Sequence, residues 1–172
     1  MDENFLKVFQ LQVLLQCRFV VFAAEQADTA LKQSNVTMAF FALQNLLNAA
    51  ANIVPGIVGR KGTAIERTTS LGNSICITDS SPLGKTLMRN NFEHFDERID
   101  TWWKNSETRM FIDQNVEPVV HSPESSKYDW FRNFDPVSTE VTFWGEDFNI
   151  QGLVNEVRRL LPKLESVCTS DD

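Results

Sequence analysis

The chain has 172 residues, of which 42% are hydrophobic and 23% charged, and its formal net charge is −7 with a pI near 4.9. This length and balance are typical of one soluble globular domain, which we place at residues 1–172. The excess negative charge argues against non-specific attraction to nucleic acid, which needs a basic surface, and leaves room only for a short RNA segment in a local basic cleft.

The cysteines and histidines are few and scattered. Cys17, Cys76 and Cys168 form no CxxC pair and there are two histidines, so the sequence predicts a reducing compartment, no metal site and no cofactor. The first residues, MDENF, are acidic where a secretion signal is basic. The apolar run after them is interrupted by polar residues such as Lys7 and Arg18. We therefore expect a cytoplasmic bacterial protein without a membrane span.

Two long helices are predicted at the start. Residues 4–32 contain no Gly or Pro, and their apolar residues cover much of a helix circumference; such a helix is usually central to a bundle or buried by a second subunit. Residues 36–54 predict a second helix, which Pro55 and Gly56 should end. Its apolar stripe has alternating spacings of four and three: Val36, Phe40, Leu43, Leu47, Ala50 and Val54.

Another side of the second helix carries Asn45, Asn48 and Asn52. Asparagine is a poor helix former unless its side chain has a role. Two interpretations stay open: a solvated surface, or a polar seam that lines a cleft or a dimer interface. A helical bundle that binds a ligand through these amides is a further hypothesis.

Residues 56–79 lose the helical period and contain four glycines, which predicts a long connection with a short helix near residues 64–71. The basic residues of this connection, with one from the next segment, are candidates for a rim that binds RNA phosphates: Arg60, Lys61, Arg67 and Lys85. The alternative is that they only balance the protein's own carboxylates.

The segment 81–104 carries the most specific pattern in the chain. Ser81 and Pro82 are typical of a helix start, and the helix should run to about residue 105 with one apolar stripe: Met88, Phe92, Phe95, Ile99 and Trp102. On such a helix His94 lies off the stripe, with Asn90 one turn before it and Arg89 within reach.

These three side chains suit metal-independent RNA cleavage. A histidine can transfer protons near neutral pH, an arginine can stabilise the charge on the phosphate, and an amide can orient either group. The run from Arg89 to His94, RNNFEH, resembles the Arg-x4-His signature of the HEPN superfamily (higher eukaryote and prokaryote nucleotide-binding domains). The resemblance implies a ribonuclease site across a dimer of helical bundles, with Arg89, Asn90 and His94 as catalytic residues.

After residue 105 the period changes to that of short strands, predicted at residues 108–119, 127–134 and 137–144. The last helix should begin near Asn149 and be kinked or ended at Pro162. Its predicted core residues are Ile150, Leu153, Val157, Leu160 or Leu161, and Leu164.

The predicted fold is an all-α, up-and-down four-helix bundle, HEPN-like, with a small antiparallel β excursion at about residues 108–145. The predicted function is that of a HEPN-like metal-independent endoribonuclease or RNA-binding protein. It would act as a homodimer in bacterial defence or stress response, with RNA and a protein antitoxin or adaptor as partners. The alternative is a catalytically inactive helical-bundle interaction module that binds a partner protein.

Overall fold

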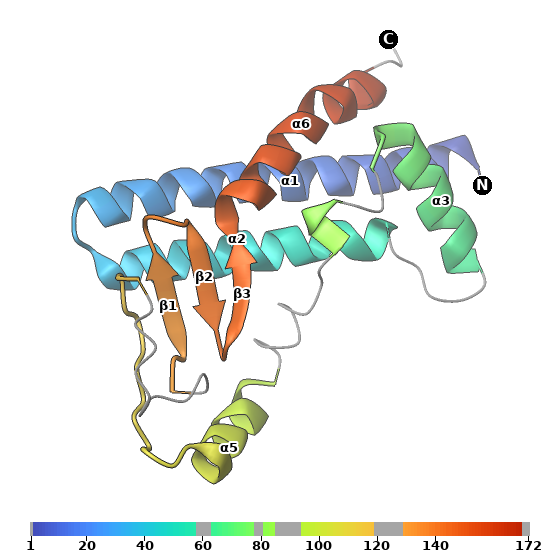
Figure 1. Ribbon diagram of the computed structural model, residues 1–172. Coiled ribbons are helices and arrows are strands. Elements are labelled where there is room, and N and C mark those ends of the chain that lie inside the picture. The colour runs from blue at the N-terminus through green and yellow to red at the C-terminus, as the bar shows by residue number, and fades with distance from the viewer. Residues whose placement is uncertain (1, 58–62, 78–80, 85–93, 119–128, 170–172) are drawn as a thin grey trace.

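The protein is mostly helical, with one small antiparallel sheet (Figure 1). The computed structural model describes residues 2–57, 63–77, 81–84, 94–118 and 129–169, and the side chains of all of these except residues 54–57, 63–68 and 84. In chain order the elements are α1 (Glu3–Lys32), α2 (Val36–Ile57), α3 (Thr63–Ile75), the 3-10 helix η1 (Pro82–Gly84), α5 (Phe95–Asn105), β1 (Arg132–Asp135), β2 (Glu140–Phe143), β3 (Glu146–Asn149) and α6 (Ile150–Thr169).

The helices α1 and α2 form a long antiparallel hairpin (Figure 1). Asp2 caps α1 by accepting a hydrogen bond from the Phe5 amide at 3.0 Å, and Asn35 caps α2 through the Met38 amide at 3.2 Å. Buried alanines leave room for the two backbones to approach: Ala23, Ala27, Ala30, Ala39, Ala42 and Ala49. The two predicted helices are therefore confirmed as one packed unit.

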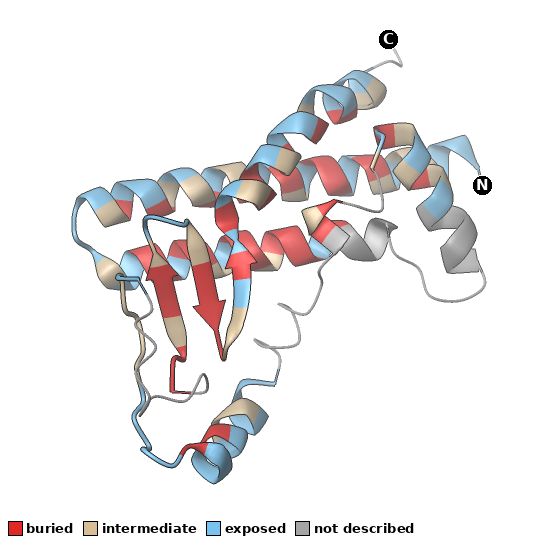
Figure 2. Cartoon of the chain, viewed as in Figure 1, coloured by how far each residue is buried: buried red, intermediate tan, exposed pale blue. Residues whose placement is uncertain are grey.

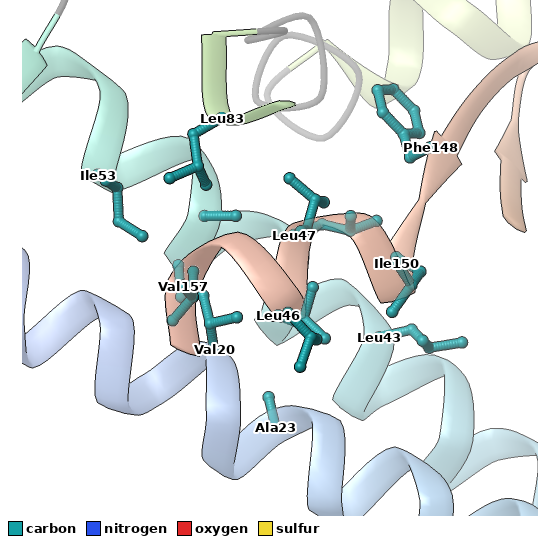
Figure 3. Packing of buried hydrophobic residues seen from close by; sticks show 14 of the residues in the cluster. Val20, Ala23, Leu43, Leu46, Leu47, Ile53, Leu83, Phe148, Ile150 and Val157 are labelled. Carbon is teal, nitrogen blue, oxygen red and sulfur yellow. The ribbon is translucent and has the colours of Figure 1, made fainter. Parts of the chain in front are cut away.

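Helix α6 crosses α1 on one side of the hairpin and closes the core (Figure 1). Val20 of α1, Leu46 of α2 and Val157 of α6 are fully buried and lie close together (Figure 3). The predicted apolar stripe of α6 is confirmed, because its members are all buried: Ile150, Leu153, Val157, Leu160 and Leu164. Each such side chain stabilises the fold by about 1.5–3 kcal/mol, so the contact of these three helices is the main core.

Two helices continue past the residues predicted to end them. Helix α2 runs through Pro55 and Gly56 to Ile57, and α6 runs through Pro162 to Thr169. Proline removes one backbone hydrogen bond from a helix interior, but Leu164, two residues later, is fully buried and holds the last turns of α6 on the core. The short helix predicted near residues 64–71 is confirmed and is longer than expected, since α3 ends at Ile75.

The sheet has the order β1-β2-β3, and both pairs are antiparallel. Phe134, Val141 and Phe148 are neighbours across the three strands and all are buried. Phe148 belongs to the same core cluster as the hairpin residue Leu47 (Figure 3). A small antiparallel excursion was predicted, and its burial against the helical core is what lets so short a sheet form.

The strand positions partly differ from the prediction. The predicted strand at residues 108–119 contributes two isolated bridges, from Ile112 and Asn115, whereas β3 forms at a position that was predicted only as the approach to the last helix. Trp144 and Gly145 form the tight turn before β3, with φ of 53° and 69°. Tryptophan rarely adopts positive φ, so this hairpin has little signal in the sequence.

The single unbroken helix predicted across residues 81–104 is wrong at two described places. The segment begins with a 3-10 turn at Pro82–Gly84, and α5 begins at Phe95 after a non-helical residue; residues 85–93 lie outside the described residues. His94 has φ −116° and ψ 42°, which is not helical, and precedes the helix as its N-cap residue without a side-chain capping bond. Asp96 and Glu97 lie in the first turn, where carboxylates stabilise the positive end of a helix. They favour a helix start at this point.

Candidate functional site

Of the predicted catalytic trio, only His94 lies among the described residues; Arg89 and Asn90 lie outside them. The His94 side chain is 54% exposed, and its Nδ1 atom is 3.5 Å from Oε1 of Glu97. The ring is therefore accessible to a ligand and lies beside a carboxylate. The sequence pattern had placed His94 relative to Arg89 and Asn90 by helical spacing. Because His94 precedes α5, this spacing does not fix its position relative to those residues.

The side chains of the predicted RNA-binding residues also lie outside the part of the chain that the structure describes. Arg60, Lys61 and Lys85 lie outside the described residues, and Arg67 is described only as a backbone position on α3. None of these four side chains is among those that the structure describes, so their position relative to His94 stays a prediction. Over the part of the chain that is described, no group of three or more His, Cys, Asp or Glu side chains could hold a metal ion.

Two other groups with potential chemistry have structural roles. Burial raises the pKa of the Cys17 thiol to about 12, so it stays protonated and unreactive at neutral pH.

The pKa of Glu156 is held below its usual value, first by the Arg159 guanidinium and then by a hydrogen bond from Ser81. Ser81 Oγ donates to Glu156 at 2.8 Å, and Arg159 donates to the Cys76 carbonyl at 3.2 Å. This group ties the segment around residues 76–83 to α6.

The predicted asparagine seam does line a groove. Asn45, Asn48 and Asn52 of α2 form one wall of a groove of about 400 Å³, opposite Phe19 and Phe22 of α1. A second groove of about 310 Å³ continues along the hairpin towards its turn, and Phe22 is common to both. The seam therefore lines a depression between two helices, and Asn45 and Asn52 in it are solvent-exposed.

The groove-lining residues of both helices belong to two stripes with alternating spacings of three and four, which continue past the grooves. The stripe on α1 is Phe5, Val8, Gln12, Leu15, Phe19, Phe22 and Gln26, and the stripe on α2 is Met38, Phe41, Asn45, Asn48 and Asn52. We call this set the α1/α2 face. Its aromatic rings stand in solvent, with Phe22 61%, Phe41 56% and Phe19 48% exposed. Figure 2 shows buried and exposed residues alternating along the two helices.

Charged residues are confined to the edge of the α1/α2 face. Helix α2 contains no Asp, Glu, Lys or Arg, and the α1 stripe itself is apolar or amide. Arg18 and Glu25 lie beside that stripe, one residue before Phe19 and Gln26 respectively. Arg18 pairs with Glu165 of α6 at 3.2 Å, with both side chains about half exposed. An acidic protein thus presents one broad face whose centre carries no charge.

The sequence had indicated the asparagine seam but not the exposed phenylalanines. The signal was present in the three-and-four spacing of Phe5, Val8, Leu15, Phe19 and Phe22, but α1 is apolar on so much of its surface that its inner and outer stripes look alike.

Two segments, Glu3–Lys32 and Val36–Ile53, are long and apolar enough to cross a membrane by length and composition. Core helices of soluble proteins and signal sequences pass the same test.

Comparisons with known proteins find no matching family model, no similar curated protein and no similar solved structure. The function of this chain is therefore inferred from its own residues, and among those that the structure describes the α1/α2 face is an exposed apolar feature without a structural role in the single chain.

Proposed function

We propose that this chain is a protein-interaction module, and that its α1/α2 face binds another protein chain in the cytoplasm. The observation that carries the proposal is the pair of exposed stripes on α1 and α2, which flank a continuous groove. A monomeric protein rarely leaves several neighbouring phenylalanines in solvent, and a large exposed apolar patch with polar surroundings is typical of an interaction site.

The composition of the face also supports a protein partner. Aromatic rings are enriched and charged residues depleted at the centre of protein interfaces, as they are between Leu15 and Gln26 apart from Arg18 and Glu25 at the edge. The amides of Asn45, Asn48 and Asn52 can each donate and accept hydrogen bonds. A protein surface can satisfy such groups, whereas lipid hydrocarbon would leave them without partners.

Photo-crosslinking tests this proposal. A benzophenone amino acid at Phe22 or at Asn48, in cells that produce this protein, should give an adduct with a protein, because the two positions lie on opposite walls of the groove. The same probe at Val137, which is 83% exposed and outside the face, is the control and should give none. Absence of a specific adduct at both Phe22 and Asn48 would reject the α1/α2 face as a binding surface.

A second candidate function is RNA cleavage, in the HEPN-like four-helix-bundle arrangement that the sequence predicted. The observation that favours it is the exposed ring of His94 beside Glu97 at 3.5 Å, since an accessible histidine next to a carboxylate is suited to proton transfer. In this proposal Arg89 would bind the scissile phosphate, Asn90 would orient the reacting groups, and Arg60, Lys61, Arg67 and Lys85 would attract the RNA.

Replacing His94 by alanine should then abolish RNA cleavage in EDTA, a reaction expected to leave 2′,3′-cyclic phosphate ends. The melting temperature should hardly change, because the His94 side chain is 54% exposed and lies outside the helical core. Val137→Ala, at another exposed position, is the control for protein preparation, and it should cleave RNA at the same rate as the parent. A His94→Ala variant that cleaves as fast as the parent, or a parent that never cleaves RNA, would end this candidate function.

A further inference from the structure

We infer that the protein chain bound at the α1/α2 face is a second copy of this protein, related to the first by a two-fold axis perpendicular to the helices. The axis passes between Val20 and Val21 of α1 and between Leu46 and Leu47 of α2. In this arrangement α1 lies antiparallel to α1 of the second copy, α2 lies antiparallel to α2, and the two hairpins together form four packed helices. The inference rests on the proposed function, because it identifies the partner of the same face.

The charges beside the α1 stripe select the register. Antiparallel helices with a heptad repeat can pair in registers that differ by one heptad, and residues flanking the seam then face each other. One register places Arg18 opposite Arg18 of the second copy, and another places Glu25 opposite Glu25. In the register between these two, Arg18 of each copy lies opposite Glu25 of the other copy. The dimer then has two attractive contacts in place of a like-charge contact. It also places Phe19 of each copy opposite Phe22 of the other.

Helix α2 is compatible with the same axis. Residues between Gln16 and Gln26 of α1 and between Asn45 and Asn52 of α2 line one groove, so an axis through that stretch of α1 crosses α2 beside the asparagines. It can there place Asn45 opposite Asn48 of the second copy. Carboxamides can pair with each other as donor and acceptor, and buried asparagine pairs are known to fix register between helices.

A register that moves the axis about seven residues towards the start of α1, past the one that pairs Arg18 with Arg18, would avoid the like charges as well. Its axis would cross the hairpin near the end of α2, beyond Asn52, and would leave Met38 and Phe41 without a facing surface. The central register faces residues 9–32 of the two α1 helices with each other and covers the α2 stripe, and it leaves Phe5 and Val8 beyond the end of the facing α1. It is therefore the register that covers the centre of both stripes without a like-charge contact.

The size of the face is sufficient for such a dimer. The part of α1 that faces its copy in this register, residues 9–32, extends for about 35 Å at 1.5 Å per residue, and two adjacent helices are about 20 Å wide. The flat area is therefore about 700 Å² per copy before the relief of side chains is included, close to the ~800 Å² per partner of stable interfaces. Helix α6 and the sheet lie on the other side of the hairpin (Figure 1).

Exchanging the two charges tests the register. Arg18→Glu and Glu25→Arg should each weaken self-association about tenfold in sedimentation equilibrium, because each variant places two like-charge pairs in its own dimer. An equimolar mixture of the two variants should recover the parent's affinity, since every pair in the mixed dimer is again attractive. Circular dichroism of each variant should match that of the parent, although Arg18→Glu also loses the exposed pair with Glu165.

Other outcomes would overturn the inference in distinguishable ways. A chain that stays monomeric, combined with crosslinked adducts whose added mass differs from 19.6 kDa, would reject the second copy but keep the binding face. A dimer whose affinity is not recovered on mixing would reject this register and the stated axis. Binding to phosphatidylcholine vesicles without self-association and without protein adducts would reject both the second copy and the proposed function.

Discussion

Replacing Phe131 by alanine is expected to lower the free energy of unfolding by about 3–5 kcal/mol, the range for removal of a fully buried aromatic ring. The Phe131 ring is 1% exposed, and four other rings surround it. Its centroid is 5.1 Å from that of Phe95, 5.0 Å from Phe111, 5.2 Å from Phe143 and 4.8 Å from Trp144. Because Phe95 begins α5 and Phe143 ends β2, this one ring joins that helix to the sheet.

Urea denaturation followed by near-UV and far-UV circular dichroism measures the effect. Phe131→Ala should lower the urea midpoint of both signals, because Phe131 belongs to the same buried cluster as the core residues of α1, α2 and α6. Phe131→Leu should lose less, because it refills much of the cavity. Val137→Ala, at a position 83% exposed, should change the free energy of unfolding by less than about 0.5 kcal/mol. If Phe131→Ala lowered the free energy of unfolding by as little as Val137→Ala, the result would contradict the packing described for Phe131.

Helical periodicity predicted the parts of the fold in which local pattern and burial agree. The stripe from Ile150 to Leu164 and the stripe from Phe40 to Ala50 are buried as the spacing indicated. The predicted start of the last helix near Asn149 is also confirmed, since α6 begins at Ile150 and Asn149 Oδ1 accepts the Gly152 amide at 2.5 Å. These features depend on residues close together in sequence, and such signals survive without knowledge of the tertiary structure.

The start of α5 could not be predicted, because the apolar stripe runs past His94 without a break in its spacing. Ser81 does act as a cap, since its Oγ accepts the Leu83 amide at 3.4 Å while donating to Glu156 on α6 at 2.8 Å, but the turn that it begins is the 3-10 helix Pro82–Gly84. The spacing of the apolar residues did not reveal that His94 has a non-helical backbone. The predicted geometry of the Arg-x4-His site depended on an unbroken helix, and its relation to Arg89 and Asn90 stays a prediction.

The α1/α2 face was only half visible in the sequence for a different physical reason. Amides such as Asn45 are easily recognised in the sequence of an apolar helix. The exposed Phe22 and the buried Val20 are both apolar residues, so the sequence alone does not distinguish their exposure. Which stripe of α1 packs inside is decided by contacts with α2 and α6, and these come from residues distant in the chain. A helix that is apolar on two sides signals a second contact surface, but the sequence does not reveal which side remains open.

Replacing Phe22 by aspartate should weaken self-association at least 100-fold while leaving the folded monomer intact. In the inferred dimer Phe22 packs against Phe19 of the second copy beside the two-fold axis, so each substitution enters the interface twice. A carboxylate there has no opposite charge facing it, and burying an unpaired charge costs several kcal/mol. In the monomer the Phe22 side chain is 61% exposed, so its loss removes little buried area from the core.

The matched control is Phe5→Asp, because Phe5 belongs to the same stripe, is also largely exposed, and lies far from the two-fold axis. It should weaken self-association by less than about tenfold, whereas Phe22→Asp should remain monomeric at concentrations where the parent is dimeric. The melting temperature of the parent should rise with protein concentration, since association stabilises the folded state, and that of Phe22→Asp should not. Equal weakening by the two substitutions would show that the centre of the interface does not lie at Phe22.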